Sequence, residues 1–281
     1  MNRHKHLFRN KKISLPSTVA LIVVMMVTML PFYIMFVGAF KPSISLITFP
    51  IDLNLFTNLT LKNVTRVWEK SDILLWLKNT FLIGLAVAFL TCFVSITAGY
   101  AFARIEFKAS KLLFMLVMAT MMMPKQILLI PNYLVADKLG LVDTGIGVVL
   151  TSIAPAFGIF LSRQLITSMP KELFEVAEID GCGEIRKFIF IALPLSLPAV
   201  GTIAIFAFFN CFNDYLWQLV MISDKKLKTL SIGISMYAQT MLGNKAAQLA
   251  VALLATIPVI ILFLVFQKFF VKGAMEGAVK G

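Results

Sequence analysis

Four residues within one apolar stretch have side chains that could bind a polar solute. Asn210, Asn213 and Asp214 are spaced at i, i+3 and i+4, and Trp217 follows at i+7. On a continuous helix this spacing places all four on one face. Amides and a carboxylate can hydrogen-bond hydroxyl groups, while an aromatic ring can cover the apolar side of a sugar. The pattern predicts a solute path, and the alternative is a polar face that joins neighbouring helices.

A second group of polar residues interrupts the apolar character of the chain. Seven charged residues fall within the 16 positions from 172 to 187: Glu172, Glu175, Glu178, Asp180, Glu184, Arg186 and Lys187. The apolar residues Leu173, Val176, Ala177 and Ile179 are expected on one face and the three glutamates of 172–178 on another, which predicts a short amphipathic helix. Gly181 and Gly183 should end it, and a second short helix, 184–191, should lead into the next apolar stretch. Such an elbow can lie on lipid, cover its own bundle or dock in another protein, and its acidic face disfavours anionic lipid.

No residues are predicted to form a catalytic or metal site. The cysteines Cys92, Cys182 and Cys211 lack metal or redox spacing, so we expect them to act as small apolar side chains. His4 and His6 lie in a basic flank and are expected to be solvated. Lys125 either extends toward the membrane surface or attracts an anionic solute.

The composition predicts an all-α integral membrane protein. Hydrophobic residues make up 59% of the chain, charged residues only 14%, and the mean hydropathy is +0.89. Apolar runs of about 20 residues are long enough to cross a bilayer. We expect a basic N-terminus (1–15), a single membrane domain (16–271) that includes the elbow as a loop at 170–191, and a tail (272–281). Six spans are predicted, at about 17–40, 79–103, 112–130, 144–163, 192–217 and 247–268.

The distribution of basic residues predicts the orientation. The six-span arrangement puts 15 of the 26 Lys and Arg residues on the side of the two termini. Five of the other 11 lie in or beside the long connection at 41–78, where the positive-inside rule applies weakly, so the comparison is 15 against six. Both termini and the elbow are therefore expected in the cytoplasm. The net charge of +12 then reflects orientation and attraction to membrane lipid, and no nucleic acid partner is expected.

The elbow also carries a family resemblance. Its sequence reads Glu175-Val176-Ala177, three residues, Gly181, nine residues, then Ile191-x-Leu193-Pro194. This spacing resembles the EAA loop of bacterial ATP-binding cassette (ABC) importers, Glu-Ala-Ala-x3-Gly-x9-Ile-x-Leu-Pro, and departs from it only at Val176. Further stretches are similar to permeases of the maltose-transporter type, and the last of them to the smaller of two paired permeases: "GYAFAR" (99–104), "MMPKQILLIPNYLVADKLGLVDT" (122–144), "FNDYLW" (212–217) and "FQKFFVKGAMEGAVKG" (266–281).

The resemblance implies a fold, a function and a set of partners. It implies a coupling helix between spans four and five that docks on a separate ATPase subunit through Glu175, Val176, Ala177, Asp180, Gly181, Ile191, Leu193 and Pro194. It also implies carbohydrate import across a bacterial inner membrane. The expected partners are a second homologous permease, two ATP-binding subunits and an extracytoplasmic solute-binding protein. In the matching stretch, the partner permeases of the family contact sugar, which supports Asn210 and Asn213 by analogy.

The chain is not expected to be an enzyme. It contains no Gly-x4-Gly-Lys-Ser/Thr phosphate loop, so ATP and Mg are expected on the partner subunits and no cofactor on this chain. Two alternatives within transport stay open: a permease for another polyol-like solute such as glycerol phosphate, and an ion-coupled secondary transporter with Asp214 as its relay. A scaffold without transport activity is a third.

Overall fold

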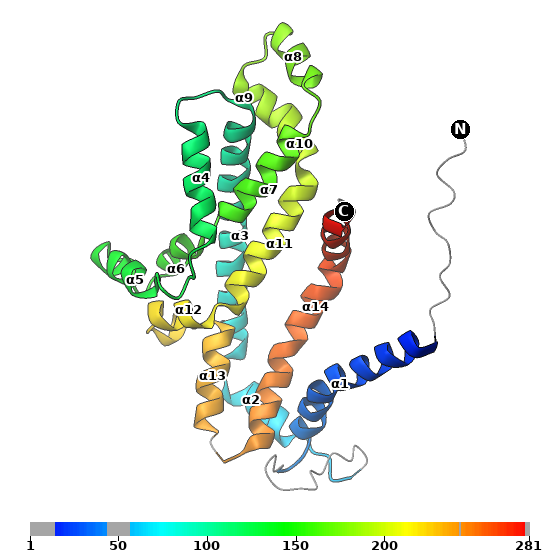
Figure 1. The fold of residues 1–281 in the computed structure, drawn as a ribbon. Helices are drawn as coiled ribbons and strands as arrows, with labels where there is room; N and C mark the ends of the chain where they lie inside the picture. The colour runs from blue at the N-terminus through cyan, green and yellow to red at the C-terminus, as the bar shows by residue number, and fades with distance from the viewer. Residues whose placement is uncertain (1–14, 44–56, 242, 279–281) are drawn as a thin grey trace. The chain divides into compact units, whose positions relative to one another are not determined.

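A computed structural model describes residues 15–43, 57–241 and 243–278 of the chain (Figure 1). Residues 1–14 of the expected basic N-terminus and residues 279–281 of the tail lie outside the described part. Throughout the described part the regular structure is helical, which confirms the all-α class. Helices satisfy their own backbone hydrogen bonds, as a segment in hydrocarbon must. The α-helices are α1 (Leu15–Ala39), α2 (Lys62–Lys70), α3 (Ile73–Arg104), α4 (Ser110–Met121), α5 (Leu129–Lys138), α6 (Gly145–Ser152), α7 (Ala156–Thr167), α8 (Glu172–Ile179), α9 (Glu184–Lys187), α10 (Leu193–Leu195), α11 (Leu197–Asn213), α12 (Tyr215–Met221), α13 (Leu230–Thr240) and α14 (Lys245–Ala278). A π-helical turn (Phe188–Ala192) joins α9 to α10, and a 3-10 turn (Lys225–Leu227) follows α12.

Three helices of the described chain are long and apolar enough to cross a membrane: α1, α3 and the part of α14 up to Leu262. Two bent pairs meet the same criteria if each is taken as one span. They are α6 with α7, bent by 50°, and the segment Glu184–Leu195 with α11, bent by 75°. The described residues thus provide three to five spans, and the span predicted at 112–130 corresponds to the shorter apolar helix α4. The six-span arrangement stays a prediction.

Breaks in the helices fall within three of the predicted spans. The span predicted at 112–130 ends as a helix at Met121, because Pro124 lacks the amide hydrogen that a continuing helix requires. The span predicted at 144–163 is interrupted between Ser152 and Ala156, where Pro155 precedes α7. The span predicted at 192–217 is broken near Ser196 and again at Asp214.

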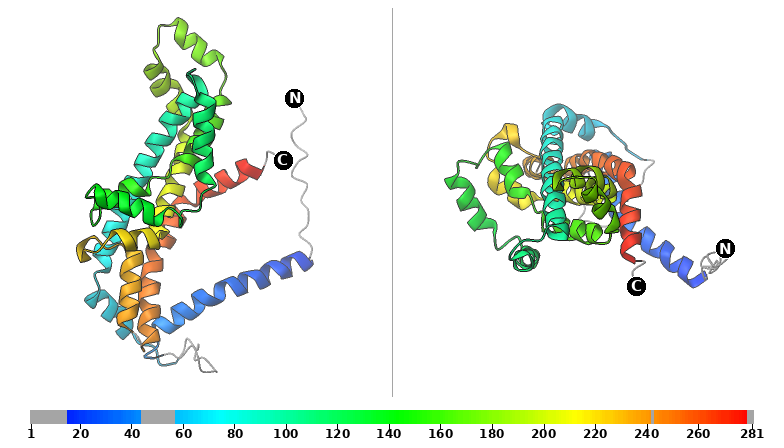
Figure 2. Two further views of the ribbon diagram at one scale, coloured as in Figure 1. Left: turned by 60° about the vertical axis from the view of Figure 1, so that its left-hand side comes forward. Right: turned by 90° about the horizontal axis from the view of Figure 1, so that it is seen from above.

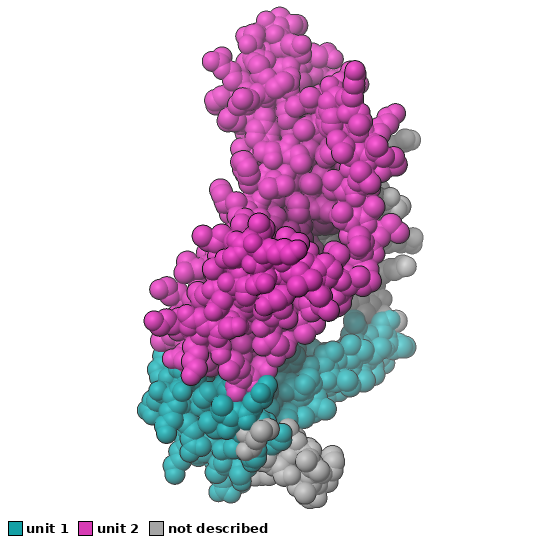
Figure 3. Space-filling model, turned by 90° about the vertical axis from the view of Figure 1, so that its left-hand side faces the viewer, with its two compact units in different colours: residues 1–71, 237–256 teal, residues 72–236, 257–281 magenta. Residues whose placement is uncertain are grey.

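The structure divides into two compact units (Figure 3). Unit 1 contains residues 1–71 and 237–256. Within it, the Asn63 side chain donates a hydrogen bond of 2.7 Å to the Lys41 carbonyl, and Val37 and Val67 are fully buried. Most of α1 is exposed, as expected for a helix that faces lipid.

Unit 2 contains residues 72–236 and 257–281, and α3, α7 and α11 pack side by side in it (Figures 1 and 2). The three helices meet at Gly158. A Cβ atom there would lie 2.7 Å from the Cβ of Ser95 in α3 and 3.1 Å from the Cγ2 of Ile203 in α11, and closer still to Ser95 Oγ. Only glycine therefore permits this approach.

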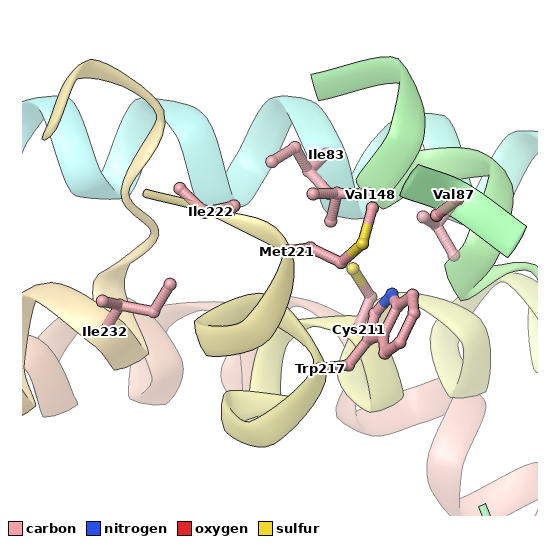
Figure 4. Close-up of a cluster of buried hydrophobic side chains, with 9 residues drawn as sticks. Ile83, Val87, Val148, Cys211, Trp217, Met221, Ile222 and Ile232 are labelled. Atoms are coloured by element: carbon pink, nitrogen blue, oxygen red, sulfur yellow. The ribbon is translucent and has the colours of Figure 1, made fainter. Parts of the chain in front are cut away.

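A buried cluster joins α12 to α3, α5, α6 and α11 within unit 2 (Figure 4). Trp217 and Met221 of α12 pack there with side chains from the other helices: Ile83, Val87, Ala136, Val148 and Cys211. Asp143 fixes the turn after α12, because its Oδ1 accepts hydrogen bonds of 2.8 Å from the backbone N–H groups of Ser223 and Asp224. The α12 segment is consequently held as a part of the bundle.

Candidate functional site

The elbow predicted at 170–191 is a projecting feature of unit 2. Helices α8 and α9 extend beyond the ends of α3, α4, α7 and α11 (Figures 1 and 2). One side of α8 packs on the bundle through Phe174 and Ala177, which are 7% and 8% exposed. The guanidinium of Arg104, at the end of α3, lies 4.1 Å from the ring centroid of Phe174. The cation–π contact and the apolar packing anchor α8 to α3.

The other side of α8 is open and combines aliphatic side chains with carboxylates. Val176 is 57% exposed and Ile179 is 86% exposed, and both Glu175 and Asp180 are also exposed. Large exposed aliphatic side chains gathered on one projecting helix are typical of an interaction surface. Among the predicted coupling residues of α8, only Ala177 faces the bundle.

Gly181 ends α8 in the left-handed conformation, with φ of +75°. The N–H of Gly181 donates to the Glu178 carbonyl at 3.0 Å, and the N–H of Cys182 donates to the Ala177 carbonyl at 2.8 Å. These two bonds form a Schellman motif, which favours glycine at this position. A Cβ on Gly181 would meet nothing within 4 Å, so backbone conformation alone requires the glycine.

Two ion pairs and a hydrogen bond fix the second arm of the elbow. Lys187 Nζ lies 3.0 Å from Glu178 Oε2 and 2.9 Å from Glu184 Oε1. The hydroxyl of Tyr100, in α3, donates to Glu184 Oε2 at 2.8 Å. Glu184 lies in the elbow, outside the predicted spans. Its hydrogen bond with Lys187 and, to a smaller extent, its hydrogen bond with Tyr100 lower its pKa below the ordinary value of 4.5.

The predicted second helix of the elbow differs from an α-helix after Lys187. A π-helical turn, Phe188–Ala192, continues it, and the N–H of Leu193 donates to the Phe188 carbonyl. Ile191 is partly buried against the cluster that contains Phe174, whereas Pro194 is exposed. The predicted coupling residues therefore divide into an open group on and after α8 and a hinge group between α9 and α11.

A cavity of about 240 Å³ lies among α3, α6, α7 and α11. Of the four residues predicted to form a solute path, Asn210 and Asp214 line it, together with Lys125. The lining also includes Thr91 and Ser152, whose hydroxyl oxygens are buried without a hydrogen-bond partner among the described residues. Hydroxyl, amide, carboxylate and ammonium groups together can bind a polar solute through hydrogen bonds and charge.

The prediction that these four residues share one helix face is wrong. Helix α11 ends at Asn213, and Asp214 caps the next helix by accepting a hydrogen bond of 3.2 Å from the Trp217 N–H. The Trp217 side chain is 7% exposed in the buried cluster (Figure 4). Its Nε1 donates to Thr151 Oγ1 at 2.8 Å. Asn213 is exposed and donates to the Phe209 carbonyl at 2.9 Å. Neither Asn213 nor Trp217 belongs to the cavity lining.

Sequence reasoning missed the contributions of Thr91 and Ser152. Each is a small polar residue in an apolar run, and its place at the cavity depends on how the helices pack. Lys125 could be noticed in the sequence, because it is a single charged residue between two apolar runs. Within the described residues there is no group of three metal-ligating side chains, and His4 and His6 lie outside them.

Comparisons with known proteins extend over nearly the whole chain. Residues 95–275 match the family model described as binding-protein-dependent transport system inner membrane component. The chain is 32% identical to the arabinooligosaccharides transport system permease protein AraQ of Bacillus subtilis, over 100% of both chains. It is 30% identical to the sn-glycerol-3-phosphate transport system permease protein UgpE of Yersinia pestis, over 92% of this chain and 94% of that one.

One solved structure with a similar fold belongs to a bacterial ABC transporter involved in the import of the acidic polysaccharide alginate. The TM-score is 0.79 at 21% sequence identity, and the match covers 91% of this chain and 95% of the other.

Proposed function

Because the chain belongs to the family of binding-protein-dependent transport system inner membrane components, we propose that it is the permease subunit of an ABC importer that moves a carbohydrate inward. The family membership confirms the resemblance found in the elbow sequence. The carbohydrate assignment is supported by full-length similarity to the arabinooligosaccharide permease. An oligosaccharide or a sugar derivative is the substrate class that fits.

The observation that carries this proposal is the two-sided elbow. Phe174 and Ala177 hold α8 to the bundle, while Val176 and Ile179 leave an aliphatic surface for a partner. An anchored helix with an open opposite face can transmit a displacement to the bundle only if another protein moves it. We assign that role to an ATP-binding subunit in the cytoplasm, where both termini of this chain would also lie.

The proposed complex also contains a second permease, a second ATP-binding subunit and an extracytoplasmic solute-binding protein. ATP and Mg bind the ATP-binding subunits, and this chain supplies no catalytic residue. Closure of those subunits would bring the elbows together and shift the helices between inward-open and outward-open states. A partner can shift that equilibrium only if it binds the two states with different affinities.

The cavity is the proposed solute contact of this chain. Asn210, Thr91 and Ser152 offer hydrogen-bonding groups to hydroxyls, and Asp214 offers an acceptor. We keep Asn213 and Trp217 out of the proposed path, because they do not line the cavity.

A second candidate substrate is a small phosphorylated polyol. The similarity to the sn-glycerol-3-phosphate permease favours it, and so does Lys125 at the cavity, because an ammonium attracts a phosphate. The proton-coupled alternative, with Asp214 as relay, differs in its energy source. Uptake driven by ATP without a proton gradient would exclude that alternative.

The experiment is uptake by proteoliposomes that contain the complex assembled from this chain and its partner subunits. ATP inside the vesicles should support uptake of labelled oligosaccharide, and Lys125→Gln should affect a phosphorylated polyol more than a neutral sugar. Ile179→Ser should reduce retention of the ATP-binding subunits during purification. Leu139→Ser, which alters a side chain 66% exposed on another part of unit 2, is the matched control. Equal subunit retention by both variants would contradict the role given to the elbow.

A further inference from the structure

A basic pocket lies at the end of unit 2 from which the elbow projects. It has a volume of about 620 Å³, and its lining comes from the end of α3, the α3–α4 connection, the start of α4, α7 and the residue that precedes α8. Figure 1 shows the α3–α4 connection and α8 at the same end of the bundle. The charged lining residues are four cations and one anion: Arg104, Lys111, Arg163, Lys171 and Glu106. Four minus one gives a formal charge of +3 within one depression.

Two of the cations are held in place by the fold. Arg104 Nη2 donates hydrogen bonds of 2.8 Å to the carbonyls of Ile166 and Met169. Arg163 Nε donates to the Phe102 carbonyl at 3.3 Å, and its guanidinium lies 4.1 Å from the ring centroid of Phe114. These contacts fix the guanidinium groups and leave both Nη groups of Arg163 for a ligand, since an arginine carries five N–H donors. The cations are therefore partly preorganised rather than freely mobile.

The start of α4 adds a backbone donor to the pocket. Helix α4 has 12 residues, and no side chain caps its N-terminus, where Ala109 adopts a φ of +65°. Ser110 and Lys111, in the first turn, line the pocket. The Ser110 N–H donates to the Phe107 carbonyl at 3.3 Å, which leaves the Lys111 N–H as the backbone donor of this lining. The first turn of a helix carries a partial positive charge, which favours an anion.

Apolar side chains complete the lining. Phe102, Ile105 and Phe107 border the same depression as the basic residues. A ligand with an anionic group and an adjoining apolar part would satisfy both kinds of lining. Basic pockets between helices near a cytoplasmic membrane surface suit the headgroups of anionic lipids.

We propose that this basic pocket binds a phosphate group, and that the phosphodiester of an anionic phospholipid supplies it. Arginine pairs favourably with phosphate oxygens because its N–H groups match their geometry. The cavity proposed for the transported solute shares no residue with this pocket, so the inference does not depend on which solute is carried.

A bound phosphate would connect the lipid surface to the elbow. Lys171 lines the pocket and directly precedes α8, and the Met169 carbonyl is held by Arg104. A ligand that bridges Lys171 and Lys111 would restrict the start of α8 relative to α4. Anionic lipid should accordingly stabilise the elbow.

The test is lipid binding to the full-length chain in neutral detergent, measured by native mass spectrometry. The probes are dioctanoyl-phosphatidylglycerol, dioctanoyl-phosphatidylcholine and inorganic phosphate. Lys111→Gln with Lys171→Gln should weaken phosphatidylglycerol binding about tenfold, because two charged contacts are lost. Lys108→Gln, three residues from Lys111 and outside the lining, is the matched control and should leave binding within about twofold. Arginine at both positions should restore affinity.

The outcomes separate the possible sources of the phosphate. Preferential binding of phosphatidylglycerol that is lost in the double glutamine variant supports the lipid assignment. Inorganic phosphate that binds with the same dependence on Lys111 and Lys171, and displaces the lipid, would overturn the lipid source and uphold the phosphate site. Equal binding of both lipids by the unaltered chain, or unchanged phosphatidylglycerol binding in the double variant, would overturn the site itself.

Discussion

The hydroxyl of Tyr100 donates a hydrogen bond of 2.8 Å to Glu184, and the bond links the long helix α3 to the second arm of the elbow across 84 residues of sequence. The Tyr100 ring also packs edge-on against Phe188, with centroids 5.2 Å apart. Motion of α9 is thus tied to α3 by a polar and an apolar contact. The bond is a direct route by which a displaced elbow would act on a predicted membrane span.

Tyr100→Phe removes this hydrogen bond and retains the ring. We expect the free energy of unfolding to fall by about 1 kcal/mol. In the assembled complex, stimulation of ATP hydrolysis by solute-loaded binding protein should also fall. Tyr215→Phe is the control, because it removes the 3.2 Å hydroxyl contact with Ser235 elsewhere in the chain. Equal losses of stimulation in the two variants would show that the Tyr100 bond contributes only to stability.

The lowered pKa of Glu184 gives the elbow a specific response to acid. Because Lys187 and Tyr100 bind the ionised carboxylate, the folded pKa lies below the ordinary value of 4.5. The stabilisation is present above pH 4.5 and is lost as the pH falls through the folded value. Glu184→Gln should therefore destabilise the chain at pH 7, and its stability should change less than that of the unaltered chain below pH 4.5. Thermal unfolding at a series of pH values measures both effects, and parallel profiles would contradict the assignment.

Gly181 and Gly183 provide a matched pair of substitutions. Gly181 has a φ of +75°, whereas the φ of Gly183 is −71°. Valine at position 181 should cost about 1–2 kcal/mol in backbone strain, and it should reduce retention of ATP-binding subunits. Asparagine at 181 should be milder, since it tolerates the left-handed region. Gly183→Ala should be close to neutral, and co-purification of the subunits with each variant compares them.

Alanine substitutions at Asn210 and Asn213 distinguish the part of α11 that lines the cavity from the part that does not. Asn210→Ala removes a lining amide and should raise the KM for uptake roughly tenfold if one hydrogen bond to solute is lost. Asn213→Ala removes only a bond to the Phe209 carbonyl and should leave uptake within about twofold. Uptake kinetics at equal complex concentration provide the measurement. A larger effect at Asn213 than at Asn210 would place the solute path elsewhere.

The elbow could be predicted from the sequence because its signals are local. The amphipathic spacing predicts α8, and Gly181 follows its C-cap residue Asp180, so neighbouring residues suffice to locate the turn. The predicted apolar face of Leu173, Val176, Ala177 and Ile179 was wrong, because Phe174 and Ala177 face the bundle whereas Leu173, Val176 and Ile179 are exposed. The π-helical turn after Lys187 was not predicted, because it depends on packing with α3.

The cavity was predictable only in part. Asn210 and Asp214 attracted notice as polar groups in an apolar run, and both line it. Helical spacing alone assigned Trp217 to the same face, and this failed because Asp214 starts a new helix by capping it. The chain direction changes there, which turns the indole into the buried cluster. Thr91 and Ser152 come together only through helix packing.

The close contact at Gly158 restricts how the bundle can change shape. Three helices touch where one residue has no side chain, and the same residue lines the cavity. Sliding α7 along α3 would drive the α7 backbone into Ser95, so the contact at Gly158 opposes such sliding. Helix α7 begins after a break at 153–155, and α11 begins after a break at Ser196. These breaks are the places near Gly158 where the chain can bend. We therefore expect any change in the shape of the cavity to come from tilting of these helices about Gly158, not from sliding of α7 along α3.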